Sequence, residues 1–85
     1  MDGVQRWTVV IDIRRVESIT HAEAHLHQRD ADHLTGQGTV IGEMTDERAP
    51  RIGEALATAR ALTDLAEHLR RTATEHAAGP VRPLR

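Results

Sequence analysis

The 85-residue sequence contains no cysteine, lysine, phenylalanine or tyrosine, and Trp7 is its single large aromatic residue. The absence of cysteine excludes disulfides and thiolate chemistry, and it fits a reducing compartment. Without Phe or Tyr, the core must be built from Val, Ile, Leu and Ala, which bury less area per residue. No apolar run reaches transmembrane length, and the polar N-terminus lacks the apolar segment of a signal peptide. We therefore expect a cytoplasmic protein with no membrane contact.

All eleven basic residues are arginine, and the formal net charge is −2. A domain that binds nucleic acid avidly is usually basic throughout, so this balance argues against non-specific RNA or DNA binding by a monomer. A local arginine patch remains compatible with it. The length indicates one domain, which buries only roughly 60–65% of its unfolded surface.

Three segments alternate between apolar and polar residues, which is the pattern of strands with one buried face. They cover residues 4–14, 21–29 and 33–43. A polar connection at 15–20 separates the first two, and turn-forming residues at 30–32 separate the last two. The alternation assigns the following residues to the inner face: Trp7, Val9, Ile11, Ile13, Ala22, Ala24, Leu26, Leu34, Gly36, Gly38, Val40 and Gly42.

The loop at 30–32 sets the expected register between the second and third strands. A two-residue loop would oppose inner to outer faces, so we reject it in favour of three residues. The resulting pairs are Leu26 with Gly36, Ala24 with Gly38, and Ala22 with Val40.

Residues 50–78 have the 3.6-residue periodicity of one long amphipathic helix, which begins near Pro50 and ends before Gly79. Small residues in its middle would allow close approach to the glycines of the third strand. Its apolar face is expected to hold Ile52, Ala55, Leu56, Ala59, Leu62, Leu65, Ala66, Leu69 and Ala73. Its solvent face is expected to hold Arg60, Asp64, Glu67, Arg71 and Glu75.

The expected fold is α+β: a three-stranded antiparallel sheet followed by one long C-terminal helix on one face, or β-β-β-α. Residues 1–79 form this single domain and residues 80–85 a flexible tail. The helix spans about 40 Å and the strands about 30 Å, so its end with Leu69, Ala73 and Ala77 lacks cover in one chain. We therefore expect a homodimer. The expected core consists of Trp7, Val9, Ile11, Leu26, Leu34, Val40, Ile52, Leu56, Leu62, Leu65 and Leu69.

The residues most suggestive of chemistry are His21, His25, His27 and His33. Imidazoles at alternate positions of one strand could hold Zn²⁺ or Ni²⁺, or sense pH. Histidines on an open sheet face are more often solvated polar residues, and spacing alone supplies no second-shell support. We predict no metal and no cofactor.

Candidate acid–base carboxylates are Asp12, Glu17 and Glu23, but a three-stranded sheet with one helix implies no deep cleft. We therefore expect a protein that is not an enzyme. The candidate anion or RNA contacts are the arginine pairs Arg14–Arg15 and Arg70–Arg71, which could also serve solubility alone.

Three segments, residues 6–13, 33–41 and 52–69, resemble a family of small actinobacterial dormancy-associated proteins of unknown function. The helix carries the most specific part, with matching residues at Ile52, Gly53, Glu54, Leu56, Ala57, Ala59, Arg60, Ala61, Leu62, Thr63, Asp64, Leu65 and Ala66. The resemblance covers about residues 4–78. It implies a β-β-β-α fold related to the core of double-stranded-RNA-binding domains, and dimerisation. It also implies a likeness in shape to ribosome hibernation promoting factors, which is fold-level analogy.

The sequence and the resemblance together predict a non-enzymatic dimeric protein of stress or dormancy that binds the ribosome or structured RNA. The alternative is a protein–protein interaction or regulatory module without nucleic-acid binding.

Overall fold

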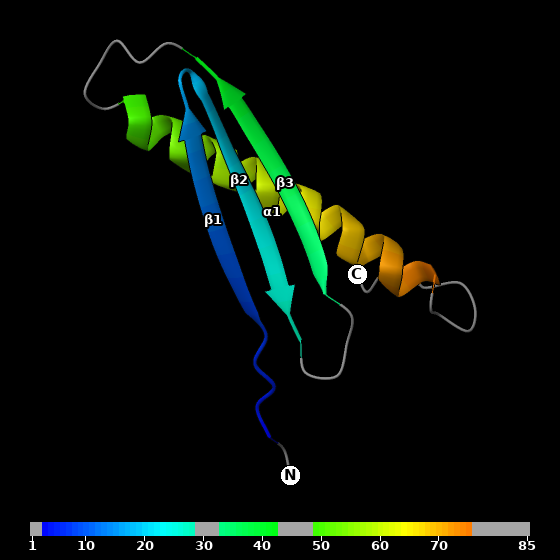
Figure 1. The fold of residues 1–85 in the computed structure, drawn as a ribbon. Helices are drawn as coiled ribbons and strands as arrows, with labels where there is room; N and C mark the ends of the chain where they lie inside the picture. The colour runs from blue at the N-terminus through cyan, green and yellow to red at the C-terminus, as the bar shows by residue number, and fades with distance from the viewer. Residues whose placement is uncertain (1–2, 29–32, 43–48, 76–85) are drawn as a thin grey trace.

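A computed structural model describes residues 3–28, 33–42 and 49–75 of the chain. It contains three strands, β1 (Thr8–Val16), β2 (Ile19–His27) and β3 (Leu34–Ile41), followed by one helix, α1 (Ala49–Glu75). The strands form an antiparallel sheet in the order β1-β2-β3, and α1 packs on one face of it (Figure 1). The predicted fold class is confirmed. The predicted tail at 80–85 lies outside the described residues.

The first two strands form a tight hairpin in place of the polar connection that the sequence suggested. Only Glu17 and Ser18 lie between β1 and β2, and Val16 pairs with Ile19. The backbone amide of Gly42 donates to the Ser18 carbonyl at 2.9 Å, which ties the start of the next connection to this turn. Glu17 has a φ of 54°, the left-handed conformation that two-residue hairpins demand.

The expected register between β2 and β3 is wrong by two residues, although the faces are right. The observed pairs are Ala22 with Gly38, Ala24 with Gly36, and Leu26 with Leu34. A shift of two leaves every side chain on the same face, so the alternation that fixed the faces could not detect it. The physical cause is the midpoint of the pairing: the observed pairs are centred on position 30, whereas the three-residue loop at 30–32 would centre them on position 31, and a midpoint one residue earlier changes every pair by two.

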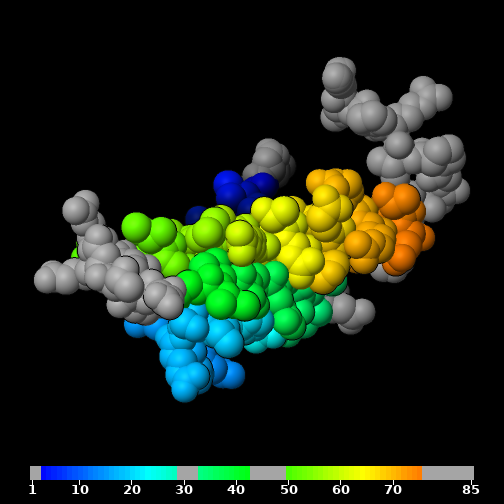
Figure 2. Space-filling view, turned by 90° about the horizontal axis from the view of Figure 1, so that it is seen from above, coloured from blue at the N-terminus to red at the C-terminus, as the bar shows by residue number. Residues whose placement is uncertain are grey.

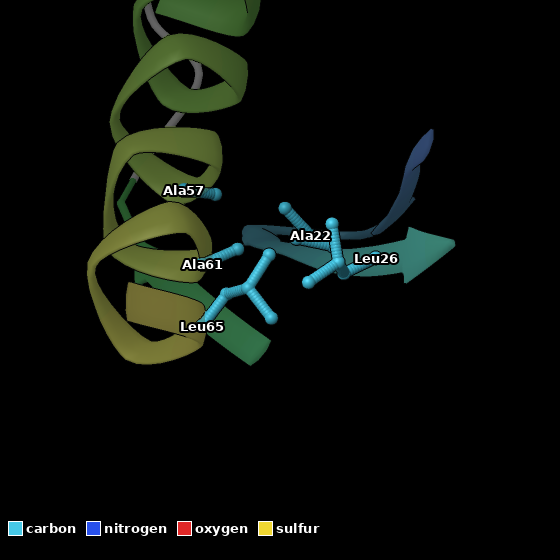
Figure 3. Close-up of a cluster of buried hydrophobic side chains, with 6 residues drawn as sticks. Ala22, Leu26, Ala57, Ala61 and Leu65 are labelled. Atoms are coloured by element: carbon cyan, nitrogen blue, oxygen red, sulfur yellow. The ribbon is translucent and has the colours of Figure 1, made fainter. Parts of the chain in front are cut away.

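The helix approaches the sheet through its smallest residues. Ala57 and Ala61 are completely buried, and Leu65 is nearly so. They meet the buried Ala22 and Leu26 of β2 (Figure 3). Together with Ala24, these residues form the compact centre of the core.

Two glycines of β3 make this close approach possible. A Cβ atom on Gly38 would meet the Ala57 carbonyl oxygen and the Ala61 amide nitrogen. A Cβ atom on Gly36 would likewise meet the backbone of Ala61 and Leu65. No larger residue fits at either position while α1 stays in place.

The seating of α1 corrects much of the expected core. Ile52, Leu56 and Leu62 are 63%, 42% and 43% exposed, and Trp7 and Val9 are 51% and 39% exposed. The physical reason is that Gly and Ala allow closer packing than the Leu and Ile ridge, so the helix turns its small stripe to the sheet. The expected residues that do pack in the core are Leu26 and Leu65, with the partly buried Ile11, Leu34, Val40 and Leu69.

The position of α1 over the sheet is lopsided. The helix lies along β3 and β2 and contacts β1 only marginally (Figures 1 and 2). In Figure 2 the β1–β2 hairpin, in blue and cyan, projects away from the helix. One helix therefore covers about two of the three strands and leaves the inner face of β1 open.

Candidate interaction surface

The inner face of β1 and the adjoining flank of α1 form an uncovered apolar surface. The register places Val9 and Ile13 on the same sheet face as the buried residues Leu26 and Ala22. Ile13 and Leu62 line one shallow hollow between β1 and the helix, and each is 43% exposed. We call this surface the apolar ledge, and we define it as Val9, Ile13, Ala55, Ala59 and Leu62.

Polar groups border the ledge near the start of α1. The Arg15 guanidinium donates to the Glu54 carboxylate at 2.8 Å, which links β1 to the first turns of the helix. Arg51 and Thr58 line the same hollow. Trp7, just before β1, continues the alternation of the inner face at the other end. An apolar strip with a polar border is typical of a protein–protein contact surface.

Periodicity alone does not reveal this surface, because the sequence pattern predicts an inner face that the helix covers completely. A signal was present nonetheless, because the third strand and not the first carries the glycines. A helix seated on glycines lies over the third strand, and the large residues of the first strand are then left without cover.

The candidate arginines do not form one patch within the chain. Adjacent residues of a strand point to opposite faces, so Arg14 lies on the open face while Arg15 lies on the helix side, bonded to Glu54. Arg70 forms an ion pair with Glu67 at 2.8 Å. That hydrogen bond, with the charges of Arg70 and Arg71, lowers the pKa of the Glu67 carboxyl.

The two arginine pairs are also far apart. Arg15 contacts Glu54 near the start of α1, and Arg70 follows about 24 Å further along the helix at 1.5 Å per residue. The exposed Arg71 lies beside Arg70 at the same end. A phosphate backbone would therefore have to bridge separate sites to use both pairs.

The four candidate histidines lie on the open face of the sheet. The ring of His33 is 4.8 Å from that of His27 and 5.3 Å from that of His25, centroid to centroid. His33 was expected across from Arg29, and the corrected register brings it beside His27 instead. His21 Nδ1 lies 3.0 Å from the Thr39 hydroxyl.

Two carboxylates compete for the imidazole of His25. Its Nε2 lies 3.2 Å from Asp12 Oδ2 and 3.4 Å from Glu23 Oε1. Across residues 3–28, 33–42 and 49–75, no three His, Cys, Asp or Glu side chains are arranged to hold a metal ion. The contacts fit a polar network on the sheet surface.

No helix of the described chain combines the length and the hydropathy needed to cross a bilayer.

Comparison with known proteins gives consistent relatives. Two uncharacterised proteins, Mb1767 of Mycobacterium bovis and MT1780 of Mycobacterium tuberculosis, are each 38% identical over 71 residues, which is 84% of this chain and 74% of theirs. The crystal structure of Rv2632c superposes with a TM-score of 0.76 at 28% identity, and the match covers 87% of both chains. A family model described as Rv2632c-like matches residues 5–81. The expected resemblance to a family of unknown function is thus confirmed at that level, and this chain belongs to the Rv2632c-like family.

Proposed function

We propose that this protein is a non-enzymatic protein-interaction module that works as a homodimer, with the apolar ledge at the contact between the two copies. The observation that carries the proposal is the ledge itself, which exposes Ile13 and Leu62 side by side. Large aliphatic residues gathered on one surface are costly in water and are typically buried by a partner.

A second copy of the chain is the occupant that the molecule favours. The buried core of one chain consists of four alanines and two leucines, which is a small core for an independent domain. In a symmetric dimer the apolar ledge of each copy would pack against that of the other, which would enlarge the buried apolar area of both.

The test replaces an apolar ledge residue by a charged one. Ile13→Asp should shift the protein from dimer to monomer in light scattering at micromolar concentration, because each interface would then bury two carboxylates. The matched control is Ile41→Asp. Ile41 is also an isoleucine of an edge strand, it is 74% exposed, and it lies on the opposite face of the sheet.

Dimeric wild type and Ile41→Asp with a monomeric, folded Ile13→Asp would support the proposal. A wild type that scatters as a single 9.4 kDa species would refute it. A dimeric Ile13→Asp would also refute it, because the ledge would then lie outside the contact.

Binding to the ribosome or to structured RNA, and the role in dormancy, stay predictions that come from the family resemblance. The divided arginines Arg14, Arg15, Arg70 and Arg71 favour the interaction module. Salt-dependent co-sedimentation with ribosomes decides between the two. Phosphate binding should lose affinity with a slope of about −0.7 to −0.9 per contact in a log–log plot against salt.

A further inference from the structure

The two edges of the sheet differ, because side chains of α1 cover the outer backbone edge of β3. Three side chains of α1, spaced four residues apart, reach its backbone. Arg60 donates to the Thr39 carbonyl at 2.8 Å, and Asp64 Oδ2 accepts from the Gln37 amide at 2.9 Å. His68 Nδ1 lies 2.7 Å from the Thr35 carbonyl, which it satisfies as a donor. We call Arg60, Asp64 and His68 the capping row.

The capping row replaces the partner strand that β3 lacks. Alternate residues of an edge strand turn their N–H and C=O groups outward, and Thr35, Gln37 and Thr39 are three such residues. An uncapped edge is a template for pairing with another chain. The sequence pattern placed Arg60 and Asp64 on the solvent face, and the structure instead uses them to close this edge.

The same ladder shows which backbone groups of β1 turn outward. The backbone N–H and C=O groups of Thr35, Gln37 and Thr39 point away from β2. The backbone groups of the residues opposite them on β2 therefore point toward β1. Those β2 residues are His21, Glu23 and His25.

Their partners on β1 are Arg14, Asp12 and Val10, which therefore hold the β1–β2 bonds. The residues between them turn their N–H and C=O groups to the outside, and these are Val9, Ile11, Ile13 and Arg15. Among the described residues, no side chain bonds to the backbone of β1.

The outer edge of β1 has the features of a pairing edge. The strand is nine residues long, without proline, and it exposes apolar residues on both faces: Val10 is 42% exposed on the open face and Ile13 43% on the helix side. Its charged residues, Asp12, Arg14 and Arg15, lie from its midpoint onward. Natural proteins guard such an edge with charge, proline or a covering element. Among the described residues, side chains cap the outward backbone groups of β3 only, and β1 has charge at Asp12, Arg14 and Arg15 but no covering element.

We propose that two copies of the chain join through antiparallel pairing of their β1 strands, which makes one continuous six-stranded sheet with both helices on the same face. The proposal rests on the homodimer of the proposed function and names its contact. The outward groups of Val9, Ile11 and Ile13 bond to the same groups of the second copy. The capped β3 edges become the two ends of the sheet, so assembly stops at two.

Pairing at β1 also brings the apolar ledges together. Val9 and Ile13 of both copies lie on the same sheet face as the helices, so the two ledges merge into one strip between the helices. A register centred on Ile11 sets Val9 beside Ile13 of the second copy and keeps the two Asp12 carboxylates from facing each other directly.

The experiment uses the absence of native cysteine. Two single-cysteine variants, Val10→Cys and Gln37→Cys, place a thiol on the same open face, at the β1 edge and at the capped β3 edge. Each is treated with a thiol cross-linker of about 8 Å, the reach of diagonal neighbours in paired strands. We expect covalent dimers from Val10→Cys and none from Gln37→Cys.

The outcomes separate this inference from the proposed function. A protein that scatters as a dimer but gives no cross-link at Val10→Cys overturns β1 pairing and leaves the homodimer intact. A cross-link at Gln37→Cys overturns the closure of β3. A protein that is monomeric in light scattering overturns both the pairing and the homodimer.

Discussion

At the scale of single residues, two leucines one turn apart on α1 differ in burial. Leu65 is 5% exposed in the core, whereas Leu62, three residues earlier, is 43% exposed on the ledge. Leu65→Ala should cost about 2–5 kcal/mol of unfolding free energy, enough to unfold much of a domain this small. Leu62→Ala should cost about 1 kcal/mol or less in the isolated chain, because it removes half-exposed surface.

Urea unfolding of both variants, at concentrations low enough to hold the protein monomeric, measures this difference. The sequence pattern alone predicts that Leu62 is the central core residue. A larger loss at Leu62 than at Leu65 would therefore restore that prediction and contradict the observed seating of the helix.

The glycine at position 38 permits the shortest approach between sheet and helix. Gly38→Val should destabilise the protein by about 1–3 kcal/mol or more, because its Cβ would meet the backbone of Ala57 and Ala61. Thr39→Val, on the opposite face, keeps a β-branched side chain in an exposed position and should be tolerated. Thermal melts that rank these two variants the other way would reverse the faces of β3.

At the scale of elements, the β1–β2 hairpin carries the one left-handed non-glycine residue of the described chain. Glu17 occupies the first position of the two-residue turn with a φ of 54°, where glycine is the preferred residue. Glu17→Gly should stabilise the protein by about 0.5–1 kcal/mol, because the relief of left-handed strain exceeds the added chain entropy. Glu17→Ala keeps the strain and serves as the control. Equal melting temperatures for the two variants would mean that the turn is unstrained.

The existence, type and order of all four elements could be predicted from periodicity, and the faces of the three strands as well. The alternation of Ala22, Ala24 and Leu26 fixes the buried side of β2 regardless of register. Register was harder to predict, because it depends on where β2 ends, and residues 28–33 carry no strong apolar pattern.

The rotation of α1 could not be predicted from hydrophobic periodicity alone. Its Leu and Ile residues outweigh its Gly and Ala residues on any apolar scale, so the pattern points to Leu62 as the centre. Packing decides otherwise, because Ala57 and Ala61 let the helix backbone lie against Gly38, and Gly53 lies against Thr20. Ala55, Ala59 and Leu62 of the apolar stripe are thereby left on the ledge, so the sequence pattern predicts a dimer but does not locate the ledge.

At the scale of the whole molecule, α1 performs two tasks on its two flanks. One flank, with Leu62, borders the open ledge beside β1, and the other, with Asp64, closes the edge of β3. In the dimer that we propose, an open edge on one side and a closed edge on the other would limit assembly to two copies. No feature of the isolated sequence separates the residues that close an edge from ordinary solvated charges, since both lie at polar positions of the same helix.

Removing the capping row should convert the closed pair into an open-ended assembly. In the triple variant Arg60→Ala, Asp64→Ala and His68→Ala, the outward groups of β3 lose their partners. Each chain then has two edges that can pair with other copies, β1 and β3. Contacts through β1 and through β3 can follow each other along the assembly, so it has no fixed size. Light scattering should show species larger than a dimer that grow with protein concentration.

The matched control replaces three exposed residues with the same spacing on the same helix: Thr63→Ala, Glu67→Ala and Arg71→Ala. It removes comparable polar surface from α1 but leaves the contacts to β3 in place. We expect this control to remain a dimer, so that growth beyond two copies is specific to the capping row. If both triple variants assemble alike, the capping row does not limit assembly, and the asymmetry between the two edges has no part in the dimer.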